Sequence, residues 1–283
     1  MIDLEENYKR VRDETFAEML KGKRRKKYKS FIRYLKDVKY IPGLRIQGNL
    51  LEGYYAYMRK HDDFADGDAK LPPGYGSAEE FIERSIEFAR NPLKPVHELD
   101  YLLLYCYSQC DLLGIDFKQE TDDILSSMLF DAKRHGKMQV FPNSVLYHHF
   151  YLLDIRGCES ACLKLYGEDS NKKLNLVQPL GLASRIYYNL RDFSDETSKG
   201  FVNISQEDME SLGISVKDLK EPDCEGVREW FYGQSMKGLS LLHGHRRIIG
   251  QGDFGLLATI TFPLVYARPA RKYFERVLKS YRS

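Results

Sequence analysis

Apolar and aromatic residues recur at helical spacing along most of this 283-residue chain. No segment keeps the strict alternation of apolar and polar residues that is typical of a half-buried strand. No repeat of about 20–50 residues stands out either. The pattern therefore predicts an all-α protein with a single domain over residues 1–283. The predicted helices cover residues 3–20, 50–66, 78–90, 96–113, 119–135, 143–166, 180–196, 224–249 and 270–281.

Proline and glycine mark the ends of several of these helices. Pro42-Gly43 breaks the chain before one helix, and a loop with two prolines and three glycines follows that helix over residues 67–76. Residues 197–200 end a later helix with a glycine. The segment after this break, residues 201–204, is expected to be extended.

Two of the predicted helices carry a pair of acidic residues four positions apart. The pairs are Asp62 with Asp66, and Asp192 with Glu196. Residues at this spacing face the same side of a helix. One such pair is typical of a solvated face, whereas buried carboxylates need a cation or hydrogen bonds. Two pairs on otherwise core-like helices favour one site for hard divalent ions, and because Mg²⁺ binds carboxylates together with phosphates, the predicted ligand is a diphosphate.

Composition and charge narrow the classes of protein. Hydrophobic residues make up 43% of the chain, charged residues 30%, and the net charge of +2 gives no reason to expect nucleic-acid binding. The five cysteines lack metal-site spacing and are expected to be free thiols in a reducing compartment. The polar N-terminus is unlike a signal peptide, so we expect a cytoplasmic protein. The apolar run over residues 254–267 is too short to span a bilayer, and either packs in the core or contacts a membrane surface peripherally.

The residues around both acid pairs resemble the squalene/phytoene synthase family of head-to-head prenyl synthases. Residues 59–66 (RKHDDFAD) resemble the first aspartate-rich motif of that family. Residues 181–201, from GLA through NLRD to KGF, resemble its second motif and the extended segment that follows. Shorter matches lie at residues 29–31 (KSF) and 128–131 (MLFD), and the resemblance covers roughly residues 28–250. It implies a divergent member with a class I isoprenoid synthase-like helical bundle around a central cavity.

The resemblance also implies a set of functional residues. Mg²⁺ would be held by Asp62, Asp63, Asp66, Asp192 and Glu196. The prenyl diphosphate substrate would be bound by Ser30, Arg33, Arg59, Asp131, Asn189 and Arg191. Catalytic roles would fall to His148, Arg185 and Tyr188. For Asp131, a surface carboxylate paired with a nearby arginine is an equally good interpretation.

Several departures from the family pattern fall in the second half of the site. The family has Gln where Arg185 stands, Asn where Tyr188 stands and Asp where Glu196 stands. An inward Arg185 would add charge, and could bind a different acceptor or an additional phosphate. His148 lies where the family has a Tyr-Cys-Tyr motif, and is either a proton acceptor that quenches a cation or a hydrogen-bonded core residue.

Three functions follow as hypotheses from this pattern. The first is a Mg²⁺-dependent prenyltransferase that condenses two prenyl diphosphates head to head. The second is an enzyme that ionises one prenyl diphosphate, either a lyase or cyclase or a transferase to a non-prenyl acceptor. The third is a non-catalytic relative of the fold. A nicotinamide reductant is not indicated, and the sequence sets neither the prenyl chain length nor the oligomeric state.

Overall fold

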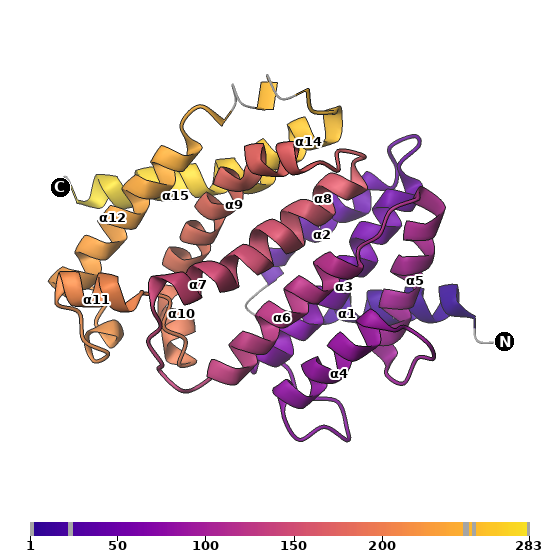
Figure 1. Ribbon diagram of the computed structural model, residues 1–283, viewed down its shortest axis with the longest axis horizontal. Helices are drawn as coiled ribbons and strands as arrows, with labels where there is room; N and C mark the ends of the chain where they lie inside the picture. The colour runs from indigo at the N-terminus through magenta and orange to yellow at the C-terminus, as the bar shows by residue number, and fades with distance from the viewer. Residues whose placement is uncertain (1–2, 22–24, 246–248, 251–252, 282–283) are drawn as a thin grey trace. The chain divides into compact units, whose positions relative to one another are not determined.

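The computed structural model describes residues 3–21, 25–245, 249–250 and 253–281, without the side chains of residues 25–27 and 30. Throughout these residues the regular structure is helical and no strand forms (Figure 1). One isolated parallel bridge joins Gln139 to Phe201. The predicted all-α fold class is therefore confirmed. No helix in the described part of the chain is both long and apolar enough to cross a membrane.

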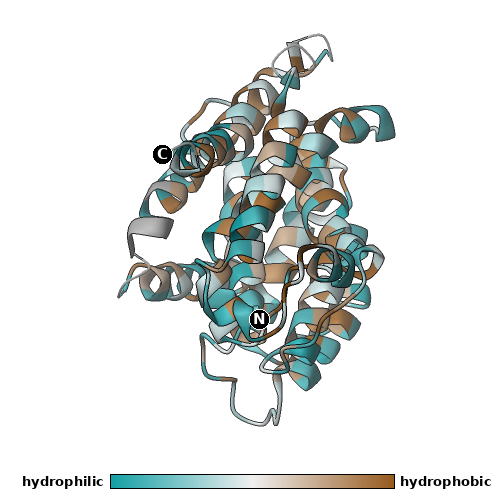
Figure 2. Cartoon of the chain, turned by 90° about the vertical axis from the view of Figure 1, so that its left-hand side faces the viewer, coloured by the Kyte–Doolittle hydropathy of each residue, from teal (hydrophilic) through white to brown (hydrophobic). Residues whose placement is uncertain are grey.

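Contacts along the backbone group the chain into two compact units, residues 1–129 and 130–283. Each unit has its own buried residues and is described by itself. That both units belong to one domain stays a prediction. Figure 2 shows hydrophilic and hydrophobic residues interspersed along the helices, as expected when each helix buries one face.

In the first unit, the helix with the first acid motif packs against several others. The helices of this unit are α1 (Leu4–Met19), α2 (Arg25–Val38), α3 (Arg45–Ala65), α4 (Ala78–Arg90), α5 (Glu98–Leu113) and most of α6 (Lys118–Arg134). Helix α3 contacts α1, α2 and α5. A Cβ atom on Gly53 of α3 would lie only 2.5 Å from the Tyr8 ring and 2.9 Å from the Cys106 sulfur. Only glycine allows α3 to approach α1 and α5 this closely, and this packing fixes the orientation of its last turn.

The second unit is organised around the helix with the second acid motif. Its elements are the end of α6, α7 (Asn143–Phe150), the π-helix η1 (Tyr151–Glu159), α8 (Ser160–Leu165), α9 (Asn171–Arg191), α10 (Phe193–Ser198), α11 (Gln206–Leu212), the 3-10 helix η2 (Asp218–Lys220), α12 (Glu225–Leu242), α14 (Leu256–Thr261), the π-helix η3 (Phe262–Ala267) and α15 (Arg268–Ser280). Helix α9 packs against η1, η3, α12 and α15. Leu180 and Ala183 of α9 are fully buried in the core of this unit.

Helix α2 was not predicted, and α3 begins at Arg45 rather than at residue 50. Three other predicted helices differ in their ends or interior. The helix expected over residues 224–249 ends at Leu242, because His243 has extended backbone angles and Gly244 a positive φ of 79°. The helix over 143–166 is continuous, but its middle is the π-helix η1. The second acid helix ends at Arg191, and a new short helix begins at Phe193.

Candidate functional site

In the first unit, Arg59 joins the acidic residues at the end of α3. Its guanidinium forms ion pairs with Asp62 and Asp63, one helical turn further on, and lies 3.9 Å from Asp68. The Arg59 side chain is only 15% exposed, and its guanidinium carbon is 5.3 Å from the centre of the Tyr28 ring. Burial alone would lower the pKa of Arg59, but the carboxylates of Asp62 and Asp63 raise it, so the side chain stays charged.

The turn after α3 continues this acidic cluster. Asp66 directly follows Ala65, the last residue of α3, as the C-cap. Its N–H donates to the carbonyl of Asp62 at 2.9 Å. The N–H groups of Asp68 and Ala69 both donate to the carbonyl of Asp63, at 2.8 and 3.0 Å. These bonds fold the loop back over the helix end. They bring the carboxylate of Asp68 towards Arg59, a contact that sequence spacing did not indicate.

A cavity of about 270 Å³ opens beside this cluster. Its charged lining includes Lys21, Lys60 and Asp63, and Lys60 forms an ion pair with Glu18. The remaining lining residues are Thr15, Glu18, Met19, Tyr28, Asp68 and Ala69. The cavity therefore places two lysines next to the acidic end of α3.

The other predicted residues of this unit have different positions. Arg33 is 82% exposed on α2 and lies 3.8 Å from Asp37, so the structure does not bring it to Arg59. The Ser30 side chain lies outside the described residues. His61, inside the motif, is fully buried on the opposite side of α3, with its ring nitrogens 2.8 Å from the Tyr57 carbonyl and 2.9 Å from the Ser85 hydroxyl. Burial lowers the pKa of His61 to about 4, so it is a neutral core residue at pH 7.

In the second unit, Arg191 pairs with the first acid of the second motif. Its guanidinium binds both carboxylate oxygens of Asp192, through Nε at 2.8 Å and through Nη2, and Nη1 donates to the Tyr187 hydroxyl at 3.2 Å. The guanidinium also lies over the rings of Tyr187 and Tyr188, at 5.0 and 4.8 Å from their centres. The predicted phosphate-binding arginine is thus held by a carboxylate and two aromatic faces.

Glu196 lies one turn beyond Asp192, as the sequence spacing predicts. Its N–H donates to the carbonyl of Asp192 at 2.9 Å, a bond of the short helix α10 that follows the end of α9 at Arg191. Burial raises the pKa of Glu196 to about 7, and Asn203 donates a hydrogen bond of 2.6 Å to its carboxyl group. Near neutral pH this group is therefore distributed between its charged and neutral forms.

Asp131, at the end of α6, belongs to a buried network. Its Oδ1 accepts a hydrogen bond from Arg134 Nε at 2.8 Å and lies 3.3 Å from His149 Nε2. Arg134 also donates to the carbonyl of Val202 at 3.2 Å. Burial would raise the pKa of Asp131, but His149 and Arg134 outweigh it and hold the pKa well below its usual range. The network ties the segment after the second motif to α6 and α7. The alternative interpretation of Asp131 is confirmed in its arginine partner, but it is wrong in placing the carboxylate at the surface, because the side chain is only 16% exposed.

Arg185 forms a buried ion pair with a residue that the sequence did not single out as functional. Its Nε and Nη2 bind the two oxygens of Asp154, at 2.6 and 3.0 Å. The guanidinium lies between the rings of Phe150 and Tyr188, at 4.9 and 5.8 Å from their centres. Asp154 lies in η1, outside the motifs that the sequence singled out. The charges of the arginine and the aspartate compensate each other.

The remaining predicted residues have contrasting surroundings. His148 is exposed on α7, whereas its neighbour His149 is 4% exposed and contacts Asp131. Tyr188 is half-buried, and burial raises its pKa to about 12, so its hydroxyl stays neutral. Asn189 is 7% exposed, and its side-chain oxygen has no hydrogen-bond partner within the described residues.

The carboxylate oxygens of both acid motifs suit a hard cation, but in each motif an arginine already forms an ion pair with these carboxylates. No group of three or more His, Cys, Asp or Glu side chains in the described part of the chain is arranged as a metal site. All candidate ligands offer carboxylate oxygens, which Mg²⁺ prefers. Oxygens of Asp62 and Asp63 both contact one guanidinium, which shows that they converge on a single positive group. These two carboxylates are the residues of the first motif that would hold a divalent ion.

Comparisons with known proteins support the fold. No family model matches the chain, and no curated protein matches it by sequence. Squalene synthase HpnC from Alicyclobacillus acidocaldarius is similar in structure, with a TM-score of 0.72 and 13% identity over 99% of this chain and 96% of that one. A dehydrosqualene synthase determined with a ligand has a TM-score of 0.69 and 17% identity, over 98% and 89% of the two chains. This chain thus has the helical fold of these synthases, as the resemblance implied.

Proposed function

We propose that this protein is a prenyltransferase-type enzyme that ionises prenyl diphosphates. The observation that carries the proposal is the shared fold over nearly the whole chain with a squalene synthase and a dehydrosqualene synthase. Within that fold, both acid motifs are accompanied by a charged arginine, and the first borders a cavity with two lysines. These groups suit a diphosphate better than a neutral substrate.

The chain's own residues would act on the leaving group and on the cation. Arg59, Lys60 and Lys21 would bind the diphosphate of the substrate. Mg²⁺ would be held by Asp62, Asp63 and Asp66 in the first unit and by Asp192 and Glu196 in the second, and would supply charge stabilisation of a diphosphate leaving group. The allylic C–O bond breaks, and its electron pair leaves with the diphosphate. The rings of Tyr187 and Tyr188, which already accommodate a guanidinium, would stabilise the resulting carbocation.

Head-to-head condensation of two prenyl diphosphates is the reaction that the fold comparison supports first. One observation favours the second candidate, in which a single prenyl diphosphate reacts alone or with a non-prenyl acceptor. Asp154 neutralises Arg185, so this arginine does not offer an uncompensated charge to a second diphosphate.

The proposal includes a cytoplasmic enzyme with peripheral membrane contact through residues 254–267, where Leu256, Ile260 and Leu264 are exposed.

Product analysis tests the proposal directly. The full-length protein is incubated with ten-, fifteen- and twenty-carbon prenyl diphosphates and Mg²⁺, and products are identified by mass spectrometry with diphosphate release measured in parallel. A hydrocarbon of two prenyl units, or its cyclopropyl diphosphate, would establish head-to-head condensation. A product of one unit would establish the second candidate. Diphosphate release that persists with a chelator would contradict the role of Mg²⁺. No turnover with any substrate would favour a non-catalytic relative.

A further inference from the structure

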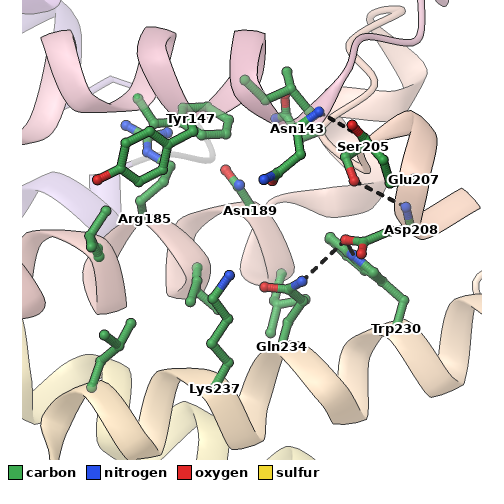
Figure 3. A pocket seen from close by; sticks show the side chains of 17 residues that line it. Asn143, Tyr147, Arg185, Asn189, Ser205, Glu207, Asp208, Trp230, Gln234 and Lys237 are labelled. Atoms are coloured by element: carbon green, nitrogen blue, oxygen red, sulfur yellow. Dashed lines mark hydrogen bonds between the residues drawn. The ribbon is translucent and has the colours of Figure 1, made fainter.

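A second cavity, of about 380 Å³, lies within the second unit between α7, α9 and α12 (Figure 3). Its volume is in the range of small-molecule sites. Apolar side chains such as Leu182, Ile186 and Leu241 form part of its wall. None of the predicted cation ligands lines it, but it adjoins the second acid cluster through Asn203, which donates to Glu196. Two of its side-chain oxygens, those of Asn189 and Asn203, have no hydrogen-bond partner within the described residues, which points to a ligand.

Asn189 lies in the middle of this cavity. Figure 3 shows its amide projecting from α9 towards the space below α7. The side chain is 7% exposed, and its Oδ1 has no hydrogen-bond partner within the described residues. Leaving a buried amide oxygen unpaired is unfavourable, and the great majority of such atoms have partners. A hydrogen-bond donor on a ligand would satisfy it.

Two cationic side chains line the cavity near Asn189, Arg185 beside it and Lys237 on the facing helix α12 (Figure 3). Lys237 of α12 has no carboxylate partner in the part of the chain that the structure describes. Arg185 uses Nε and Nη2 for Asp154, which leaves Nη1 without a hydrogen bond among the described residues. A small anion placed here would meet one unneutralised ammonium group and one available guanidinium N–H.

The opposite end of the cavity is acidic. Glu207 accepts a hydrogen bond of 2.7 Å from the Asn143 N–H, and Asp208 accepts bonds from Trp230 at 3.1 Å and Gln234 at 3.4 Å. These partners are neutral donors, and no lysine or arginine of the described chain pairs with either carboxylate. This end therefore repels a second anionic group and attracts hydroxyl donors.

We propose that this cavity binds a small organic anion that carries hydroxyl groups, a hydroxylated phosphate or carboxylate. Its anionic group would contact Lys237 and Arg185. Its hydroxyl groups would donate to Asn189 and, at the far end, to Asp208. The inference rests on the lining of this cavity and on no cation held by the acid motifs, although two of its residues, Arg185 and Asn189, are also predicted residues of the prenyl diphosphate site.

Calorimetric titration of the full-length protein tests this site with four probes. Glycerol 3-phosphate and glycerate combine an anion with hydroxyl groups, whereas inorganic phosphate and glycerol each carry only one of these features. We expect at least one hydroxylated anion to bind saturably, and both single-feature probes to bind at least about tenfold more weakly, since a hydrogen bond to a charged group contributes about a factor of ten or more. If only one hydroxylated anion binds, the result identifies the anionic group that the cavity selects.

Two variants locate the binding in this cavity. Lys237→Met removes the charge at an exposed position where the fold is retained, and Asn189→Leu removes the central amide. Each is expected to weaken binding about tenfold or more. Lys272→Met, at an exposed lysine of α15, is the matched control and should bind as the unmodified protein does. Absence of saturable binding by any probe, equal binding of inorganic phosphate, or unchanged binding by Lys237→Met would overturn the proposal.

Discussion

The two acid motifs follow the same pattern along the chain but have different surroundings. In the first, Arg59 joins Asp62 and Asp63 at the partly exposed end of α3, beside a cavity. In the second, Asp192 is paired with Arg191, while Glu196 is buried enough for its pKa to rise to about 7. The difference teaches that residue spacing specifies where carboxylates lie, whereas the charge that they carry is set by the residues packed around them.

Breaking the buried ion pair beside the second motif should have the largest effect. Asp154→Ala would leave the charge of Arg185 buried and unpaired, which costs about 3–5 kcal/mol in the free energy of unfolding. Urea denaturation of the variant would measure this loss. Asp37→Ala, at an acid that is 66% exposed, is the control and should change stability by less than about 0.5 kcal/mol. Replacing Asp154 and Arg185 together by leucine should recover most of the loss, and a double variant as unstable as the single one would argue against this account.

The first motif is expected to affect activity more than stability. Asp62→Asn keeps the size of the side chain but removes a charge that would hold the cation. We expect kcat to fall roughly a hundredfold or more, because such charge stabilisation contributes several kcal/mol to the transition state. Diphosphate release measures the effect, with Asp37→Asn as an exposed control. An Asp62→Asn enzyme with full activity would remove the first motif from the mechanism.

The adjacent histidines of α7 provide a sharper comparison within the second unit. His149→Ala would remove a buried partner of Asp131 and is expected to lower the free energy of unfolding by about 1–3 kcal/mol. His148→Ala, on the exposed side of the same helix, should stay within about 0.5 kcal/mol. Thermal unfolding of both variants would test this. If His148→Ala instead abolishes activity while leaving stability unchanged, the exposed histidine regains the proposed role of proton acceptor.

The smallest effect concerns pH and Glu196. The folded-state pKa of this carboxyl, about 7, is above its ordinary value of 4.5, so the folded protein binds more protons between these values. Stability is therefore expected to fall as pH rises from about 4.5 to 7, by up to about 1 kcal/mol per pH unit from this group. Activity should change in the opposite direction, because the charged form binds the cation. Glu196→Gln should abolish both trends, and their persistence would assign them to another group.

The sequence predicted the fold and the acid motifs because both depend on local spacing. Helical periodicity and capping residues define α4 over Ala78–Arg90 as expected. The i,i+4 relation of Asp192 and Glu196 is kept although α9 ends at Arg191, because Asp192 is the N-cap of the next short helix. The contacts of Asp154, Asp68 and His149 were not predicted, because each joins residues from different elements. A partner for a charged side chain depends on tertiary packing, which spacing along one helix does not contain.

The π-helix η1 changes the direction in which the later side chains point in the long helical segment from Asn143 to Leu165. Because each of its turns contains more residues than an α-helical turn, the faces of α7 and α8 are rotated relative to those of an uninterrupted α-helix. This offset places Asp154 against Arg185 and Glu159 beside Gly181, both on α9. Removing one residue from Tyr151–Glu159 would restore the regular phase and shift every later side chain by about 100°. The number of residues in η1 therefore determines which side chains of this segment contact α9, as much as the identity of any single residue does.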